Sequence, residues 1–342
     1  MQPCLEQEKT DLKRARIIQL DRSYPLCELE QTGEQIRAEF AISLTKSKQD
    51  SKACVGDWVL LDRPKDHDKA LICSIEARRS ELGRWDGSSM GDKQVLAANV
   101  DLVIALVPLQ KDLVDRVELL RMLKALVLAY DGSCRAAVVL SKADRKQTEQ
   151  DLELDIQRVK DCLGALADEI KIIVTSAQTG QGIANLRALV DQKACCSVLV
   201  GQSGAGKSSL ANALLGEDLL ETAEVRAKDD RGRHTTVART LLRLPSGGEL
   251  IDVPGLRSFP LRGHDKGLEL AFPEISQAAQ ACKFRDCSHG EEPGCAVREL
   301  VEQGELPLLR LDLYRSLLKE MNRMEEKMDS SVRRYSRKKG PR

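Results

Sequence analysis

The stretch GQSGAGKSS, residues 201–209, decides how the rest of the chain is interpreted. The fixed positions of the phosphate-loop pattern G-x-x-x-x-G-K-[ST] are filled by Gly201, Gly206, Lys207 and Ser208. The apolar run CCSVLV (195–200) before the loop predicts a strand, and residues 210–215 after it predict a helix. A glycine loop between a strand and a helix can turn its backbone N–H groups toward a phosphate. The stretch therefore predicts a nucleotide-binding domain.

Each residue of the loop is a candidate contact for the phosphates, which gives the set Gly201, Gln202, Ser203, Gly204, Ala205, Gly206, Lys207, Ser208 and Ser209. We expect the Lys207 ammonium to lie against the β- and γ-phosphates and to promote hydrolysis. We expect the Ser208 hydroxyl to bind the Mg²⁺ that accompanies the nucleotide. The competing interpretation, a Gly/Ser loop that fits by chance, does not account for the strand and helix on either side.

Two further segments indicate that the base is guanine. Ser141-Lys142-Ala143-Asp144 follows a predicted buried strand (135–140) and is similar to the [NT]-K-x-D loop of GTPases. The Asp144 carboxylate can accept hydrogen bonds from both N1–H and the 2-amino group of guanine, which adenine cannot provide. Residues 175–177 follow another predicted strand and resemble the second guanine loop, with Ser176 and Ala177 near O6. Taken alone, the first segment could equally be a solvated loop, and the second is too short to be specific.

Residues on the C-terminal side of the phosphate loop predict the magnesium site. Asp252-x-x-Gly255 follows a predicted strand and resembles the loop whose Asp supports Mg²⁺ and whose Gly senses the γ-phosphate. Thr235 or Thr236 would complete the Mg²⁺ shell when GTP is bound. In ordinary GTPases the base-reading segments follow the phosphate loop, whereas here they precede it. The set is therefore complete but circularly permuted, a rearrangement that is tolerated when new termini fall in exposed loops.

A Cys/His cluster follows the permuted segments. The run CKFRDCSHGEEPGC (282–295) spaces its possible ligands as Cys-x4-Cys-x-His-x5-Cys, which are Cys282, Cys287, His289 and Cys295. Three thiolates and one imidazole suit a tetrahedral Zn²⁺ ion, and because protein fills all four positions the ion would be structural. The competing interpretation is chance clustering of three of the eleven cysteines.

The remaining sequence suggests three domains. Five short β-like runs (15–20, 24–30, 36–42, 57–62 and 70–75) predict a small barrel of the OB type, which often binds RNA. Strands and helices then alternate, as in an α/β fold with a parallel sheet. The resulting division is an OB-like barrel with a basic linker at 78–92 (1–92), a permuted phosphate-loop domain (93–262) and an α-helical zinc domain with a basic tail (263–342).

Composition excludes several classes of protein. The 342 residues carry 53 Lys+Arg and 53 Asp+Glu, so net charge does not indicate a partner, although the acid-free tail (331–342) could contact RNA phosphates. The N-terminus lacks the apolar segment of a signal peptide, and no apolar run is long enough to span a membrane. We therefore expect a cytoplasmic protein. The other eight cysteines are expected to be reduced, and most of them buried.

At this point the chain resembles a known family, the ribosome-small-subunit-dependent GTPases of the RsgA (YjeQ/EngC) type. The resemblance covers about residues 15–328 and depends on the segments AANVD (97–101), GQSGAGKSSL (201–210), GRHTT (232–236), DVPGLRSF (252–259) and the zinc run. It implies a monomeric factor in late 30S maturation. Such a factor binds 16S rRNA through its barrel and zinc domain, and hydrolyses GTP to GDP when the subunit stimulates it.

Two departures from related patterns affect the expected site. Ser141 stands where the family usually has Asn, which would loosen the connection between the base-reading loop and the phosphate loop. Leu256 follows D-x-x-G, where Ras-like enzymes place a water-orienting Gln, so the resemblance implies His234 as the catalytic residue that positions water. Two alternatives remain open at this stage. They are a permuted GTPase of another ribosomal assembly step, and an RNA-binding module whose nucleotide is structural.

Overall fold

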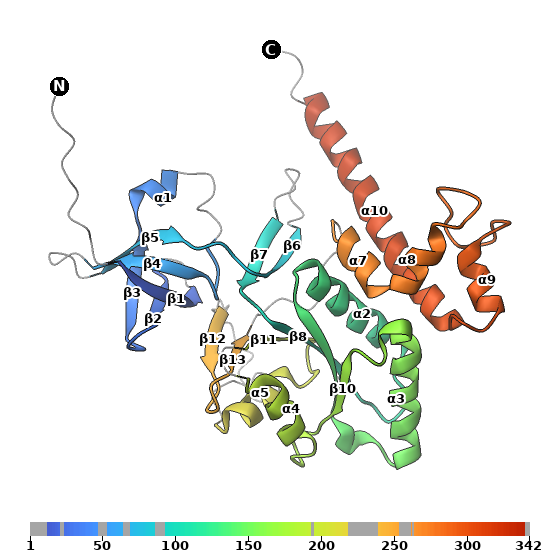
Figure 1. Ribbon diagram of the computed structural model, residues 1–342, viewed down its shortest axis with the longest axis horizontal. Coiled ribbons are helices and arrows are strands. Elements are labelled where there is room, and N and C mark those ends of the chain that lie inside the picture. The colour runs from blue at the N-terminus through green and yellow to red at the C-terminus, as the bar shows by residue number, and fades with distance from the viewer. Residues whose placement is uncertain are drawn as a thin grey trace.

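The computed structural model describes residues 12–20, 24–46, 53–63, 69–85, 93–192, 195–217, 239–252, 261 and 263–338, without side chains for 46, 84, 85, 93 and 324–338. Figure 1 shows an N-terminal barrel, a central layered domain and a C-terminal group of helices. A single strand order, β10-β9-β8-β11-β13-β12-β1-β2-β3-β5-β4, runs through the barrel and the central domain. The three-part architecture predicted from the sequence is therefore observed.

The barrel is formed by five strands and one short helix. These are β1 (Lys13–Leu20), β2 (Leu26–Leu29), β3 (Gln35–Phe40), α1 (Ile42–Lys46), β4 (Trp58–Asp62) and β5 (Ala70–Ile75). Pairing of β1 with β4 closes the barrel, and β3 runs parallel to β5. Alternate apolar residues fill its interior, including Ile17, Val59 and Ile72. The five predicted β runs agree with these strands to within a few residues.

The predicted linker at 78–92 is wrong in part. Residues Glu81–Trp85 form β6, which pairs antiparallel with β7 (Lys93–Ala98) in a separate two-stranded sheet. The Gly and Ser residues of this segment suggested a linker, whereas residues 81–85 form a strand through their pairing with β7. The β6 backbone also bonds to the end of α2 (Arg116–Asp131), since Glu81 N–H donates to the Gly132 carbonyl at 3.2 Å.

The central sheet contains five parallel strands and one antiparallel strand. In spatial order they are β10 (Lys171–Val174), β9 (Arg135–Ser141), β8 (Leu102–Pro108), β11 (Cys196–Val200), β13 (Glu249–Asp252) and the antiparallel β12 (Arg239–Arg243). One face packs on α2 and α3 (Glu149–Leu163), and the other packs on α4 (Ile183–Val190) and α5 (Lys207–Leu215). The strands are buried on both faces, which explains why their sequences are nearly continuously apolar.

The base-reading strands β9 and β10 come before β11 in the chain, but lie in the same parallel sheet as β11. The carboxyl ends of parallel strands lie at one edge of a sheet, so segments that are shuffled along the sequence can still meet there.

The barrel is joined to the central sheet through β1 and β12. These strands pair antiparallel, with Gln19 opposite Thr240 and Leu20 opposite Arg239. Beside this junction, Arg16 of β1 forms a 2.7 Å ion pair with Glu249 of β13, and both side chains are less than 5% exposed. Buried charges are tolerated when they are paired, so this contact fixes the barrel against the sheet.

Asn99 strengthens the same junction. It adopts a positive φ of 54°, and its side-chain amide donates to the Gly56 carbonyl of the barrel at 2.9 Å. Its side-chain oxygen accepts from Arg79 N–H at 3.0 Å. Asn99 belongs to the AANVD segment, whose sequence indicates no structural role for it, and in the structure it connects the barrel with the central domain.

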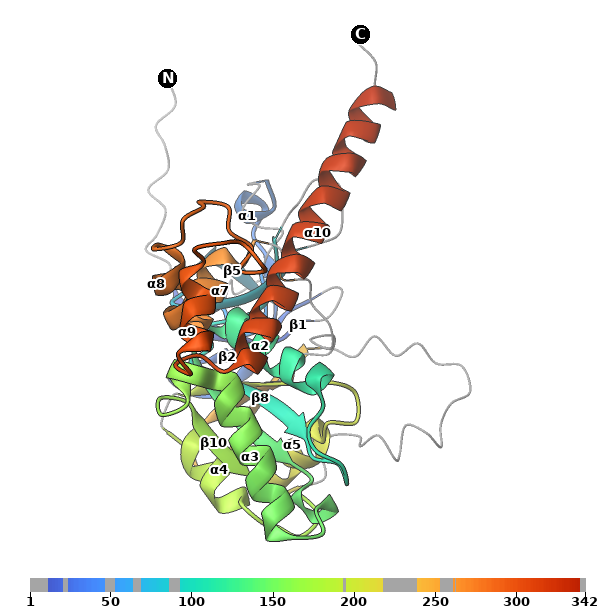
Figure 2. The ribbon, with the colours of Figure 1, turned by 90° about the vertical axis from the view of Figure 1, so that its right-hand side faces the viewer.

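The C-terminal helices are α7 (Asp265–Ala271), α8 (Pro273–Ala279), α9 (Ala296–Glu302) and α10 (Leu308–Lys338). The sequence predicted an α-helical domain here without indicating α7 or α8, and the helical backbone of α10 continues to residue 338. Figure 2 shows the end of α10 projecting away from the other elements. Residues 331–338 of the predicted basic tail are therefore part of this helix.

Arg310 attaches α10 to its neighbours. Its buried guanidinium donates to the Cys162 carbonyl at 2.7 Å and to the Ala271 carbonyl at 2.9 Å, and it pairs with Glu274. The guanidinium also stacks 4.5 Å from the centroid of the Phe272 ring. A single side chain thus connects α10 with α3 and with the helices that precede the cysteine cluster.

The cysteines outside the cluster are free, as expected, in the described part of the chain. Burial raises the pKa of the Cys27, Cys134 and Cys162 thiols to about 12, so they remain protonated. Cys54, Cys195 and Cys196 are also buried, and Cys73 is partly exposed. Cys4 lies outside the described residues. These thiols serve as small apolar side chains.

Candidate functional site

The predicted phosphate loop joins β11 to α5, as its sequence requires. Gly206 precedes the helix at φ 94°, a conformation that favours glycine, and Lys207 is the first helical residue. A Cβ on Gly201 would lie 3.0 Å from the Leu106 Cβ, so a larger residue would require β8 or the loop to shift by a few tenths of an ångström. The loop backbone is therefore shaped by glycine at both ends, with the N-terminus of α5 directed at its interior.

Lys207 folds back over the loop that precedes it. Its ammonium donates to the Gly201 carbonyl at 2.8 Å and to the Gln202 carbonyl at 2.7 Å. The charged end of the side chain therefore lies over the start of the loop, on the path of the phosphates predicted there. Ser208 and Ser209 follow in the first turn of α5.

The base-reading loop lies directly against the phosphate loop. Ser141, at the end of β9, is 1% exposed, and its hydroxyl donates to the Ala205 carbonyl at 2.7 Å. Lys142 has a φ of 62°, and its Cε lies 3.9 Å from the position that a Cβ on Gly206 would take. The connection that the change from Asn to Ser was expected to loosen is thus made by the serine hydroxyl.

Asp144 is held by the second predicted guanine segment. The Ser176 hydroxyl donates to an Asp144 carboxylate oxygen at 2.5 Å, and Ala143 N–H donates to the Thr175 carbonyl at 3.0 Å. Ser176 Oγ also accepts from Thr179 N–H at 3.2 Å, which fixes the turn before α4. The structure therefore brings residues 141–144 and 175–177 together beside the phosphate loop.

The possible magnesium ligands are placed by adjacent parallel strands. Asp252 ends β13, and Ser208 follows the loop after β11; Val198 of β11 lies opposite Ile251 of β13. A hydroxyl and a carboxylate are hard oxygen ligands of the kind that Mg²⁺ prefers.

Of the other predicted residues, Thr235, Thr236, Gly255 and the proposed catalytic His234 lie outside the described residues.

Sequence reasoning missed one contact with the phosphate loop. Arg121 of α2 donates to the Gln202 side-chain oxygen at 2.9 Å and pairs with Glu118 one turn earlier. No motif contains Arg121, and the amphipathic pattern of residues 113–130 assigns it only a helical position. Its role depends on the tertiary packing of α2 against β8, the strand that pairs with β11.

The arrangement can bind a nucleoside triphosphate. Segments from β9, β10, β11 and β13 meet at one edge of the sheet, as the permuted order predicts. They place a lysine, a helix N-terminus and loop N–H groups beside a carboxylate suited to guanine. A serine hydroxyl and an aspartate are available for Mg²⁺. These groups match what phosphoryl transfer to water needs in positioning and charge stabilisation.

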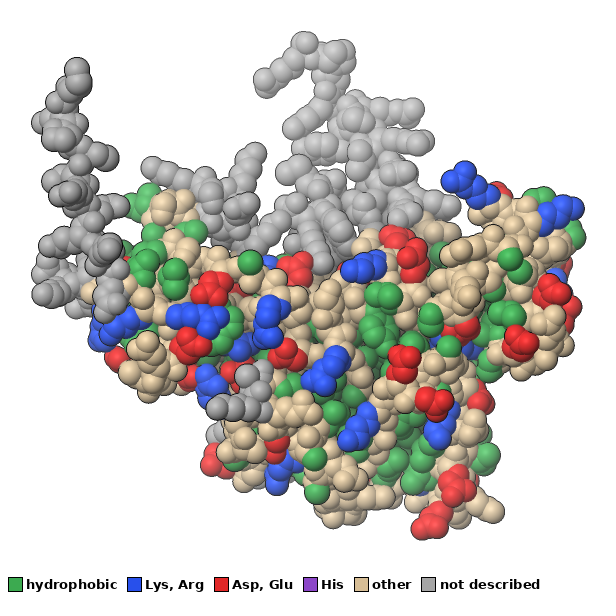
Figure 3. Space-filling model, viewed as in Figure 1, with side chains coloured by type: hydrophobic (Ala, Val, Ile, Leu, Met, Phe, Trp, Pro, Cys, Tyr) green, Lys and Arg blue, Asp and Glu red, His purple; other side chains and the backbone are tan. Residues whose placement is uncertain are grey.

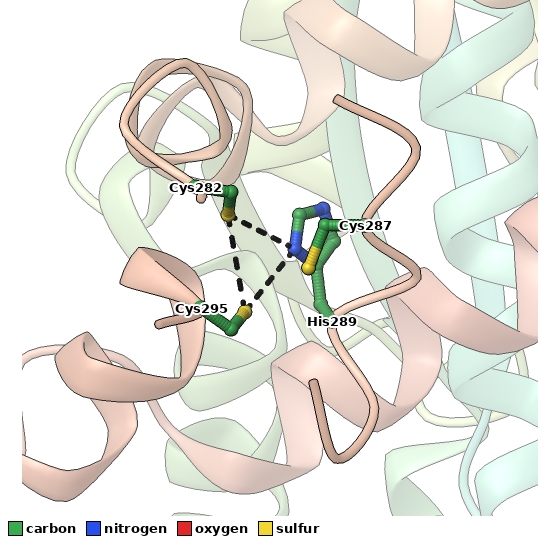
Figure 4. Close-up of side chains that lie close together, drawn as sticks. All are labelled: Cys282, Cys287, His289 and Cys295. Atoms are coloured by element: carbon green, nitrogen blue, oxygen red, sulfur yellow. Dashed lines mark hydrogen bonds between the residues drawn. The ribbon is translucent and has the colours of Figure 1, made fainter. Parts of the chain in front are cut away.

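The four cysteine-cluster residues converge as predicted (Figure 4). Cys282 Sγ lies 3.7 Å from His289 Nδ1 and 3.9 Å from Cys295 Sγ, and Cys295 Sγ lies 3.5 Å from His289 Nδ1. The possible ligand atoms of all four residues, including Cys287, lie within 4.8 Å of one another. A tetrahedral Zn²⁺ separates its N and S ligands by about 3.5–3.8 Å, so the donor set and spacing fit this ion.

Surrounding groups support the cluster. Burial lowers the pKa of His289 and so favours the neutral imidazole that binds metals. The Glu292 carboxylate accepts from Ser288 N–H at 3.0 Å and from Gly290 N–H at 2.7 Å, which fixes the backbone on both sides of His289. The Tyr314 ring of α10 lies 6.0 Å from the His289 ring, between centroids, and connects the cluster to the core.

Comparisons of sequence agree with the geometry. A sequence model of the RsgA GTPase family matches residues 75–262. The small ribosomal subunit biogenesis GTPase RsgA of Streptomyces avermitilis is 39% identical over 322 residues, which are 94% of this chain and 83% of that protein. The protein of the same name from Methanosarcina acetivorans is 34% identical over 92% of this chain and 82% of its own length.

Solved structures show the same fold. YjeQ from Thermotoga maritima is 27% identical, with a TM-score of 0.67 over 91% of this chain and 98% of its own. YloQ, described as a circularly permuted GTPase, is 22% identical, with a TM-score of 0.64 over 95% of this chain and 99% of its own. Both likenesses extend from the barrel to the C-terminal helices, so the arrangement of the three parts is shared.

Proposed function

This chain belongs to the RsgA GTPase family and hydrolyses GTP, and we propose that it does so on the small ribosomal subunit during late 30S maturation. The observation that supports the proposal is that Ser141 bonds to the phosphate loop at Ala205, while Ser176 holds Asp144 three residues further along the same segment. It combines guanine recognition with phosphate binding in one site, and the relatives are named for small-subunit biogenesis.

We propose that the chain's own groups position the reaction. Asp144 selects guanine, and the loop N–H groups and Lys207 hold the phosphates for in-line attack by water. Ser208 and Asp252 would hold Mg²⁺, with Thr235 or Thr236 completing its shell. This ion neutralises charge on the β- and γ-phosphates when bound. His234 remains our proposed water-positioning residue, and unchanged subunit-stimulated turnover of His234→Ala would remove it from the mechanism.

We propose that the barrel and the zinc domain contact 16S rRNA. Five-stranded barrels of this kind commonly bind oligonucleotides. On the face in Figure 3, basic and acidic side chains are interspersed, in keeping with the zero net charge.

The Cys282 cluster would hold one structural Zn²⁺ and stabilise its domain. Within the described part of the chain, none of the helices combines the length and the apolar character needed to cross a membrane. We infer a cytoplasmic monomer.

The deciding experiment compares steady-state GTP turnover of the full chain alone with turnover in the presence of 30S subunits, 50S subunits, 70S ribosomes or free RNA. We expect only 30S subunits to raise kcat substantially, and Lys207→Ala to abolish turnover in every case. Stimulation by 50S particles, 70S ribosomes or RNA, with no response to 30S, would assign the chain to another assembly step. The result would contradict the proposed partner and leave the GTPase activity intact.

A further inference from the structure

Helix α2 reaches the phosphate loop through Arg121. The guanidinium donates to Gln202 Oε1 at 2.9 Å, while the carbonyl of the same Gln202 accepts from the Lys207 ammonium at 2.7 Å. Gln202 is therefore held by two contacts, one from Arg121 of α2 to its side chain and one from Lys207 to its backbone carbonyl. Its backbone position cannot change without altering both contacts.

Glu118 directs the Arg121 guanidinium toward the loop. The carboxylate is 8% exposed and pairs with Arg121 through one oxygen, while its other oxygen has no hydrogen-bond partner among the described residues. Burial raises the pKa of Glu118, and the Arg121 guanidinium beside it acts in the opposite direction. Arg121 Nη1 contacts both Glu118 and Gln202, so the ion pair favours the orientation in which Arg121 reaches the loop.

The helix that carries Arg121 is itself anchored. Arg116 donates to Ser316 Oγ at 2.7 Å and to the Asp312 carbonyl at 3.1 Å, and the Lys124 ammonium contacts the Glu320 carboxylate at 2.6 Å. The contacts of Arg116 and Lys124 all go to α10, whereas Arg121 projects from α2 toward Gln202. Helix α2 thus forms a fixed support between the C-terminal helix and the phosphate loop.

We propose that Arg121 is a positioning residue for GTP hydrolysis and acts through Gln202 to hold the phosphate loop in its productive shape. The proposal rests on the GTPase function described above. Because the phosphates are stabilised by pre-oriented loop N–H groups, a shift of the loop lowers kcat more than it weakens nucleotide binding. Arg121 itself need not touch the nucleotide.

The test is a double-mutant cycle with Arg121→Met, Gln202→Met and the double variant, assayed for basal GTP turnover and for GTP affinity. We expect each single variant to lower kcat about ten-fold, with affinity changed less than about three-fold. If Arg121 acts through Gln202, the double variant is no slower than either single variant. Arg187→Met is the matched control, because Arg187 donates to the Ala213 carbonyl at the far end of α5.

Folding is monitored by thermal unfolding, since Arg121→Met leaves Glu118 buried without its partner. Gln202→Met keeps that pair intact, so a loss of kcat in this variant cannot be caused by an unpaired Glu118. Unchanged kcat in Gln202→Met, or multiplicative losses in the double variant, would overturn the proposal. Failure of 30S subunits to stimulate the wild-type chain would instead contradict the proposed partner, because this cycle is measured without ribosomes.

Discussion

The buried hydroxyl of Ser141 donates a hydrogen bond to the backbone carbonyl of Ala205, and so joins the proposed base-reading loop to the predicted phosphate loop. Removing the hydroxyl in Ser141→Ala leaves that carbonyl without this donor. A net loss of about 1 kcal/mol is expected, or about five-fold weaker GTP binding, which isothermal titration calorimetry can measure.

Ser276→Ala is the control for this change, because Ser276 also donates to a backbone carbonyl, that of Glu269, at an exposed position on α8. It should bind GTP as the wild-type chain does. Equal affinities of Ser141→Ala and the wild-type chain would show that the connection between the two loops does not contribute to binding.

Asp144→Asn should change which base is accepted. The carboxylate can accept from guanine N1–H and the 2-amino group, whereas an amide would present a donor that suits the 2-oxo group of xanthine. We expect kcat/KM to fall about 100-fold for GTP and to rise for xanthosine triphosphate, since a base whose polar groups are left unpaired in the site is rejected. Asp161→Asn, on the partly exposed surface of α3, should leave both values unchanged. Retained preference for GTP would exclude Asp144 from base selection.

Metal removal should destabilise the C-terminal helices. Cys282, Cys287, His289 and Cys295 are spaced for one tetrahedral ion, and structural zinc contributes directly to folding free energy. We expect about one Zn²⁺ per chain by mass spectrometry, and a lower Tm after chelation or in Cys295→Ser. Cys73→Ser, a partly exposed free cysteine outside the cluster, should retain the metal. A purified chain without zinc, and with a Tm insensitive to chelator, would contradict this assignment.

Arg310→Met should lower the stability of the whole chain. The substitution leaves Glu274 without its buried partner and removes donors from two backbone carbonyls. Breaking a buried pair in this way costs about 3–5 kcal/mol, which urea unfolding can detect. Arg298→Met removes an exposed pair with Glu302 on α9 and should change the unfolding free energy by less than about 1 kcal/mol. Similar midpoints for the two variants would show that Arg310 does not hold α10 in place.

Local sequence patterns predicted most of the fold. Strand and helix periods placed the barrel, the parallel sheet and the helices around the phosphate loop, because each of these elements has a continuous buried face. The helices α7 and α8 were missed because each has only seven residues, too few to show a period. The β6 strand was missed because glycine and serine near it suggested a linker.

The candidate site also contains residues that local patterns predict and residues that they do not. The loop residues, Asp144 and the cysteine cluster belong to motifs whose spacing follows from local chemistry, so the sequence could predict them; the convergence of the cluster is confirmed, and the roles of the loop residues and Asp144 stay predictions. Asn99, Arg121 and Arg310 bond to residues that lie up to 43, 81 and 148 positions away in the chain, respectively. No local pattern distinguishes such residues from other polar side chains.

The pairing of β1 with β12 has a consequence for how the chain can be divided. β12 is the antiparallel strand at the end of the central sheet, and the barrel supplies its outer neighbour. A fragment that begins after the barrel would expose this strand as an open edge, and open edges recruit other chains into aggregates. By pairing with β12, the barrel therefore covers an edge through which the catalytic domain could otherwise self-associate. The barrel and the catalytic domain should be expressed together as one chain.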